Sequence, residues 1–288
     1  MQELVIISGK GGTGKTSLTA SFAALAKNVV LADCDVDAAD LHLLLHPDIQ
    51  RRESFTSGAT AVVDPAQCVQ CGVCREVCRF DAINAAYTVN PFACEGCRVC
   101  AYLCPVNAIA MHDSVCSEWY LSTTTYGPMV HAQLGAGAEN SGKLVATVRQ
   151  QAKQIAEAQQ KSLIIIDGPP GIGCPVMSTL TGTTFVVIVT EPTLSGLHDL
   201  QRVAELTAHF KIPTSVCVNK YDLNQEITGQ IETYCADHHL SFLGTLPYDL
   251  VMVKSLVQRV PVVEYAQNGI TDQIRQIWQK IEQQLNSA

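Results

Sequence analysis

Charge is scarce in this sequence, and positive charge is the scarcest. Only 16% of the 288 residues are Asp, Glu, Lys or Arg, against about 25% in an average protein. The 19 Lys and Arg are outnumbered by 27 Asp and Glu, which leaves a net charge of −8 at pH 7. A surface of that sign repels phosphate backbones, so we expect no nucleic-acid partner. With 47% hydrophobic residues, the composition excludes a disordered polyelectrolyte and predicts a large buried core.

Membrane and export segments are missing as well. No apolar run reaches the ~18 residues that a membrane-spanning helix needs. The chain starts MQELVIISGKGG, without the basic segment and cleavage site of an export signal. Apolar residues from Ile270 to Leu285 have helical spacing, but the charges among them cancel, whereas a membrane-surface helix needs a basic face. We therefore expect a cytoplasmic protein with no membrane partner, and a C-terminal helix that packs on the core.

Cysteine, by contrast, is abundant. Eight of the 13 cysteines lie between Cys68 and Cys104. In a chain of this length without an export signal, such density indicates metal binding rather than disulfides. The spacing C-x₂-C-x₂-C-x₃-C occurs twice, as in bacterial ferredoxins, where the fourth cysteine of each run binds the other cluster. We predict two 4Fe–4S clusters, one held by Cys68, Cys71, Cys74 and Cys104, the other by Cys94, Cys97, Cys100 and Cys78.

Two other interpretations of the cysteine runs stay open. Pairs of the form C-x₂-C also suit tetrahedral zinc, although two complete quartets favour clusters. A purely structural role, in which clusters only brace this segment, is also compatible with the sequence. The first run has Arg79 where a proline usually stands, as Pro105 does after the second run, but this change removes no ligand.

Outside the cysteine-rich segment, strands alternate with helices, which predicts a doubly wound parallel α/β sheet. Apolar runs predict strands at Glu3–Ile7, Val29–Ala32, Leu163–Asp167, Phe185–Val189, Thr214–Asn219 and Phe242–Leu246. Helical patterns cover Thr16–Lys27, Leu144–Gln160 and Leu197–His209. We expect a P-loop NTPase domain made of residues 1–56 and 116–288, interrupted by a small α+β ferredoxin-like insert at 57–115. Residues 116–143 contain four glycines and a proline and are expected to form a long irregular connection.

A phosphate-binding loop follows the first strand. Residues 9–16 read GKGGTGKT and satisfy the pattern G-x-x-x-x-G-K-[ST], in which backbone N–H groups and a helix N-terminus face phosphate oxygens. Lys15 is expected to reach the β- and γ-phosphates, and the Thr16 hydroxyl to bind Mg²⁺. We predict that ATP or ADP is held by Gly9, Lys10, Gly11, Gly12, Thr13, Gly14, Lys15, Thr16 and Ser17.

Lys10 is a second lysine inside this loop, and cradling one nucleotide does not require it. With this residue the chain resembles the MinD/ParA/Mrp group of deviant Walker ATPases, whose superfamily includes the nitrogenase iron protein. The resemblance implies that Lys10 reaches the nucleotide of a partner subunit, in a homodimer or in a heterodimer with a paralogue. It also implies that Asp35 positions the attacking water and that Asp167 is the Walker B aspartate. Lys10, Lys15, Asp35 and Asp167 are therefore the expected catalytic residues.

The same resemblance extends to the nucleotide base. It places Asn219, in the segment Asn219–Asp222, on adenine, and it places Pro247 near the base. Asp35 and Asp167 follow the carboxyl ends of strands, where nucleotides bind in open α/β sheets. For the neighbouring Asp33 and Asp37, a site role and a solvated strand-end position are equally compatible with the sequence.

The whole chain resembles MinD-type ATPases that carry an inserted two-cluster ferredoxin domain. Three functions follow: an ATPase that gates electron transfer to a redox partner, a cluster carrier for apo-proteins of the Mrp kind, or a positioning ATPase of the MinD kind. The missing basic membrane helix disfavours the third, and the missing C-terminal C-x-x-C disfavours the second. Cys174 lies at the offset from Asp167 at which the nitrogenase iron protein has a cluster ligand. We nevertheless expect no third cluster, because neither Cys34 nor Cys116 supplies a second matching ligand.

Overall fold

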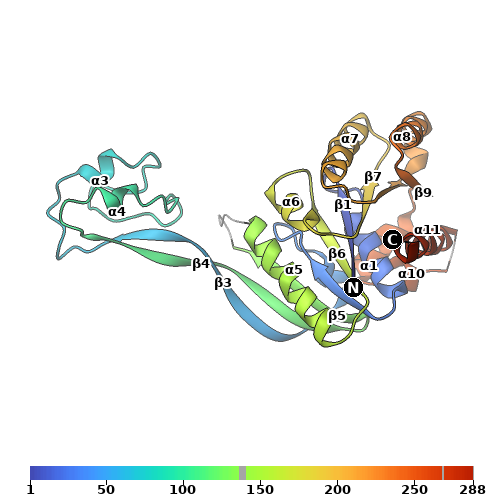
Figure 1. Ribbon diagram of the computed structural model, residues 1–288, viewed down its shortest axis with the longest axis horizontal. Helices are drawn as coiled ribbons and strands as arrows, with labels where there is room; N and C mark the ends of the chain where they lie inside the picture. The colour runs from blue at the N-terminus through green and yellow to red at the C-terminus, as the bar shows by residue number, and fades with distance from the viewer. Residues whose placement is uncertain (136–140, 268, 288) are drawn as a thin grey trace. The chain divides into compact units, whose positions relative to one another are not determined.

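Two compact units make up the chain in the computed structural model, which describes residues 1–135, 141–267 and 269–287 (Figure 1). The larger unit comprises Met1–Glu53, Trp119–Gln133 and Ser141–Ala288, and the smaller consists mainly of Ser54–Glu118. The unit boundaries fall inside or at the ends of long strands. The chain enters the smaller unit along β3 (Asp48–Val63) and returns along β4 (Ile109–Thr124), which are neighbours in the sheet.

The described strands form one sheet in the order β3-β4-β5-β2-β6-β1-β7-β8-β9. The pairs from β5 through to β9 are parallel. The central strands are buried and apolar along most of their length, as expected where helices cover both faces. Their bounds are β1 Gln2–Ser8, β2 Val29–Asp33, β5 Gly127–Leu134, β6 Leu163–Pro170, β7 Phe185–Thr190, β8 Thr214–Asn219 and β9 Ser241–Leu246.

Helices flank the parallel strands on both faces, which confirms the predicted doubly wound α/β fold (Figure 1). One face carries α5 (Ser141–Ala158), α6 (Cys174–Leu180), α7 (Leu194–His209) and α8 (Gln225–Asp237). The other carries α1 (Lys15–Leu25), α2 (Leu41–Leu45), α10 (Val262–Tyr265) and α11 (Gly269–Ser287), and α9 (Leu250–Gln258) packs on α10. None of the helices in the described part of the chain is long and apolar enough to cross a membrane.

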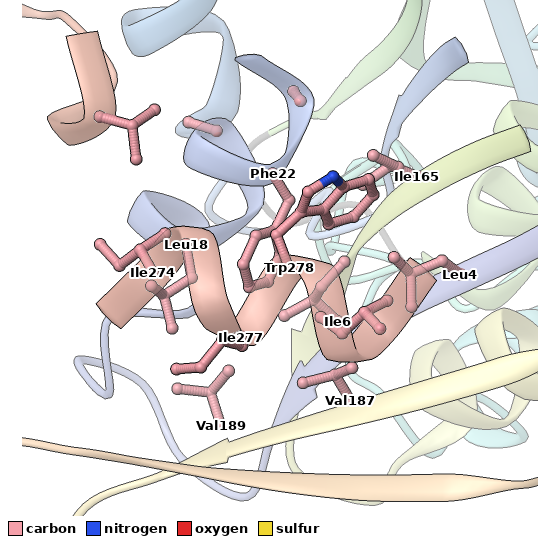
Figure 2. Packing of buried hydrophobic residues seen from close by; sticks show 14 of the residues in the cluster. Leu4, Ile6, Leu18, Phe22, Ile165, Val187, Val189, Ile274, Ile277 and Trp278 are labelled. Carbon is pink, nitrogen blue, oxygen red and sulfur yellow. The ribbon is translucent and has the colours of Figure 1, made fainter. Parts of the chain in front are cut away.

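The C-terminal helix completes the core, as its spacing predicted. Trp278 of α11 stacks on Phe22 of α1 with ring centroids 5.5 Å apart. Figure 2 shows both rings next to Ile165, with Ile6 and Leu4 of β1 beneath them. Burial of such aromatic and aliphatic side chains stabilises each by about 1.5–3 kcal/mol relative to exposure. The helix is therefore a structural element of the larger unit.

The prediction of an irregular connection over residues 116–143 is wrong for residues 116–134, which lie in β4, in β5 and in the short turn between them. Only two residues separate these neighbouring strands, so they run antiparallel. Gly127, which suggested a loop, lies at a close approach between strands: its φ is 147°, and a Cβ there would come within 2.5 Å of the Val29 carbonyl oxygen. Residues 136–140 lie outside the described part of the chain, and α5 begins at Ser141.

The smaller unit has little apolar interior. Its core cluster consists of Ala61, Cys74, Ile83 and Ile109. Two four-residue helices, α3 (Val73–Glu76) and α4 (Val99–Tyr102), contact each other, and each carries the third cysteine of a run. A unit of this size with so small a core normally needs disulfides or metal to be stable.

Candidate functional site

The phosphate loop joins β1 to α1 and closes against the end of β8. Gly12 and Gly14 adopt φ values of 79° and 91°, a region that favours glycine. A Cβ on Gly14 would lie 2.4 Å from Asn219 Nδ2, and this Nδ2 donates to the Thr13 carbonyl oxygen at 2.8 Å. Thr13 Oγ1 is buried and has no hydrogen-bond partner among the described residues. Since buried polar groups are normally bonded, this loop has the features of a ligand site.

Lys15 lies at the centre of a buried ionic network. Its Nζ is 2.9 Å from Asp167 Oδ1 and 3.3 Å from Asp35 Oδ2. Asp167 also accepts hydrogen bonds from Thr16 Oγ1 at 2.7 Å and from Thr19 Oγ1 at 2.9 Å. The structure therefore brings together the predicted residues Lys15, Thr16, Asp35 and Asp167 at the carboxyl edge of the sheet.

Negative charge exceeds positive charge in this network. Burial raises the pKa of Asp33 well above its usual range, and repulsion from Asp167 raises it further. Burial also raises the pKa of Asp35. Burial alone would lower the pKa of Lys15, but the charges of Asp167 and Asp35 outweigh it and raise that pKa. The carboxylates of Asp35 and Asp167 with the Thr16 hydroxyl fit an additional cation, because carboxylate and hydroxyl oxygens are the ligands that Mg²⁺ prefers.

The structure separates the roles of Asp33 and Asp37. Asp33 is fully buried and accepts the backbone N–H groups of Asp35 at 3.1 Å and Leu41 at 3.2 Å. It therefore positions the segment that carries Asp35. Asp37 is exposed.

Lys10 lies at the surface within the phosphate loop, and its side chain bonds to groups that the sequence did not predict. Its Nζ is 2.7 Å from Glu191 Oε1 and 3.1 Å from the hydroxyls of Thr193 and Ser195. Lys220 Nζ lies 3.0 Å from the other Glu191 oxygen. Burial opposes ionisation of Glu191, but the bonds from both lysines lower its pKa. The feature of the sequence that indicates a site role for Glu191 is its position just after β7, at the sheet edge where the other site carboxylates lie.

The eight cysteines of the two runs line two pockets of the smaller unit. The pocket lined by Cys68, Cys71 and Cys74 also contains Cys104, from the second run. The pocket lined by Cys94, Cys97 and Cys100 also contains Cys78, from the first run. Apart from Glu95 and Arg98 in the second pocket, the other lining residues carry no charge. In neither pocket do the described side chains converge as three or more ligands of a single metal ion do.

Among the described side chains, the cysteines outside the two runs form no such set. Cys174 is exposed at the start of α6, whereas Cys34, Cys217 and Cys235 are buried. Burial raises the pKa of the Cys34 and Cys217 thiols, that of Cys217 to about 12. The side chain of Cys116 lies outside the described part of the chain.

A parallel sheet with a glycine-rich loop between β1 and α1, and with acidic residues at neighbouring strand ends, defines a P-loop nucleotide-binding protein. Within that class, the chain belongs to the CobQ/CobB/MinD/ParA nucleotide binding domain family. The sequence profile of this family matches residues 4–262 of the chain. MinD/ParA ATPases of this family hydrolyse ATP.

Relatives match along nearly the whole chain. An uncharacterized protein of Methanocaldococcus jannaschii is 30% identical over 98% of this chain and 97% of its own length. The cell division ATPase MinD of Pyrococcus furiosus is 18% identical, with a TM-score of 0.59 and 98% of each chain covered. The septum site-determining protein MinD of Pyrococcus horikoshii, solved with Mg-ADP, is 17% identical, with a TM-score of 0.60 over 97% of this chain and 95% of that one.

Proposed function

We propose that this protein is an ATP-binding and ATP-hydrolysing iron–sulfur protein in which nucleotide-driven dimer switching gates electron transfer from two 4Fe–4S clusters to a partner protein. The observation that carries the proposal is the lining of the two cysteine pockets. Each combines three thiols of one run with the fourth thiol of the other, which is the arrangement of two-cluster ferredoxins. Thiols that surround a pocket without converging on one point suit a multi-iron cluster better than one zinc ion, whose sulfurs lie about 2.3 Å from the metal.

In this proposal the nucleotide site works through its charged network. Lys15 exchanges Asp35 for phosphate oxygens, which leaves Asp35 available to hold a water molecule. Thr16 and Asp167 would hold Mg²⁺, which supplies charge neutralisation at the phosphates. Asp35 is followed along the chain by α2 and then by β3, which enters the smaller unit. A shift of the Asp35 segment is therefore coupled, through the chain itself, to the strand that leads to the cysteine pockets.

The first test is the metal content. Anaerobically purified protein is expected to contain about eight irons and eight acid-labile sulfides per chain, from two clusters. Stoichiometric zinc, or iron and sulfide for one cluster only, would contradict the proposal. An ATPase assay with and without chemical reduction then tests the coupling, since gating requires that hydrolysis respond to the redox state.

A cluster carrier is the second candidate, and the exposure of Cys71 and Cys97 favours it, because accessible ligands ease transfer. Incubation of the iron-loaded protein with an apo-ferredoxin separates the two functions. Retained iron supports electron transfer, whereas stoichiometric transfer supports the carrier.

Replacing Lys10 with alanine is expected to leave nucleotide affinity within about threefold of the original. The Lys10 side chain bonds to Glu191, Thr193 and Ser195, so its loss leaves Lys15, the residue expected to hold the phosphates, undisturbed. Dimerisation and hydrolysis with Mg-ATP are expected to be lost, since the dimer in this proposal uses Lys10 across the interface. Light scattering and phosphate release measure the two effects. Lys27→Ala, at an exposed lysine, is the control, and normal hydrolysis by monomeric Lys10→Ala would reject the cross-subunit role.

A further inference from the structure

The smaller unit contains a further hollow besides the two cysteine pockets. It has a volume of about 360 Å³ and is lined by residues from the end of β3, from positions 65–70 and from positions 86–91. The described residues that line it are all uncharged. Its volume lies within the range of small-ligand sites, so the hollow can hold one small molecule.

The hollow shares a wall with the cysteine pocket that contains Cys71. Val63, Cys68 and Tyr87 line both of them. In the function proposed above, Cys68 is a ligand of the cluster in that pocket. A molecule bound in the hollow would therefore contact a residue that holds a cluster, which is the short separation that electron transfer requires.

Tyr87 is held firmly in this shared wall. Its φ is 57°, in the left-handed region that few residues other than glycine adopt. Its hydroxyl donates to the Gln70 carbonyl oxygen at 2.7 Å. Asn84 Oδ1 fixes the surrounding turn by accepting the backbone N–H groups of Ala86 and Thr88, each at 2.9 Å. A wall that is arranged before the ligand arrives reduces the entropy lost on binding.

The lining favours a neutral, flat molecule that accepts hydrogen bonds. A charged ligand would lose its hydration here without gaining a charged partner. Pro65, Pro91 and Tyr87 offer ring surfaces to the hollow, and aromatic rings pack well on such surfaces. Among the polar lining residues, Thr88 has a hydroxyl and Gln70 an amide, and both groups can donate to carbonyl oxygens. A conjugated ring that bears carbonyl oxygens meets these conditions.

We propose that the hollow binds an uncharged, carbonyl-bearing redox ring, either a quinone or the isoalloxazine ring of a flavin, which accepts electrons from the adjacent cluster. The proposal rests on the iron–sulfur function proposed above and names the group that takes the electrons on their way to the partner. The ring takes up two electrons, one from each reduced cluster, and two protons from water. The clusters return to their oxidised form, and no covalent bond to the protein forms or breaks.

Equilibrium dialysis of the anaerobic, iron-loaded protein tests the binding. The two probes are menadione, an uncharged quinone, and riboflavin, an uncharged flavin. Saturable binding of about one ring per chain is expected, and the probe that binds more tightly identifies the source of the ring. Ala86 lines the hollow and is exposed, so Ala86→Trp fills the hollow and is expected to weaken binding about tenfold or more.

The matched control is Ala85→Trp, because Ala85 is exposed on the same turn but does not line the hollow. This variant is expected to bind the ring within about twofold of the wild-type affinity. Equal iron and sulfide contents in the wild-type protein and both variants show that Ala86→Trp still folds.

Electron transfer is measured with the same three proteins after chemical reduction of their clusters. The rate at which the ring oxidises the clusters, followed by visible absorbance, is expected to saturate with ring concentration. The rate is expected to fall about tenfold or more in Ala86→Trp and to stay close to the wild-type rate in Ala85→Trp. Oxidation by ferricyanide, which needs no ring site, is expected to be equal in all three.

The outcomes separate this inference from the proposed function. A cluster-containing protein that shows no saturable ring binding would overturn the inference and leave the proposed function intact. Equal weakening by Ala85→Trp and Ala86→Trp, or an oxidation rate that neither substitution changes, would also overturn the inference alone. A protein that contains no iron–sulfur cluster would overturn the proposed function, and with it the redox role of the ring.

Discussion

Replacing Lys15 with methionine is expected to destabilise the nucleotide-free protein by about 3–5 kcal/mol at pH 7 and to abolish nucleotide binding. The lysine is the cation nearest to Asp167 and Asp35, at 2.9 and 3.3 Å, and it also offsets the charge of the buried Asp33. Methionine fills a similar volume but leaves these buried carboxylates without a partner. Urea unfolding measures the stability, and titration with a fluorescent nucleotide measures the binding.

The loss is expected to depend on pH in a defined direction. Asp33 and Asp35 have a pKa that is raised in the folded state. Between the pKa of the unfolded chain and that of the folded protein, the folded state therefore binds more protons. For such groups, stability is highest below the pKa of the unfolded chain and falls as the pH rises through the folded pKa. Without Lys15 both pKa values rise further, so the deficit of the variant shrinks between pH 7 and pH 5.

Lys27→Met provides the matched control, because this lysine is exposed and such substitutions usually change stability by less than about 0.5 kcal/mol. A Lys15→Met protein as stable as this control would contradict the assignment of a charge-compensating role. A deficit that grows on acidification would show that the carboxylates do not cause it.

The sequence predicted most of the strands that are buried on both faces, because a continuous apolar run such as residues 3–7 has few other stable conformations. It did not predict β3, β4 or β5, although the centre of β5 is buried. Most of β3 is exposed or half-buried, with charged residues at Arg51–Glu53, so its alternation of apolar and polar residues is weak. Where this alternation is weak, glycines within strands, such as Gly58 and Gly127, resemble the glycines of turns. Paired strands with little burial leave a weak signal in the pattern of hydrophobicity.

The candidate site, like the fold, contains residues that the sequence predicted and residues that it did not. Lys15 and Asp167 were predicted together, because a phosphate loop and a following strand-end aspartate meet at one edge of a parallel sheet. Glu191 was not predicted, since its role depends on Lys10 and Lys220 meeting it from two separate loops. Contacts between side chains from different loops have no periodicity, and the position of each loop follows only from the whole sheet.

The pairing of cysteines between the two runs predicts the outcome of a set of double substitutions. Cys78→Ser alone is expected to remove about four of eight irons, because Cys78 lines the pocket of Cys97 and not that of Cys71. Combined with Cys97→Ser, which affects the same cluster, it still leaves about four irons. Combined with Cys71→Ser, it leaves none.

Pairing within each run predicts the reverse, with iron retained in the variant that lacks Cys78 and Cys71 and lost in the one that lacks Cys78 and Cys97. Iron and sulfide analysis after anaerobic reconstitution therefore decides between the two arrangements without identifying either cluster. Cys174→Ser is the control, because Cys174 is exposed and outside the smaller unit; it is expected to keep about eight irons. A loss of about two irons per chain in that variant, together with loss of the dimer, would instead indicate a third cluster shared between two subunits.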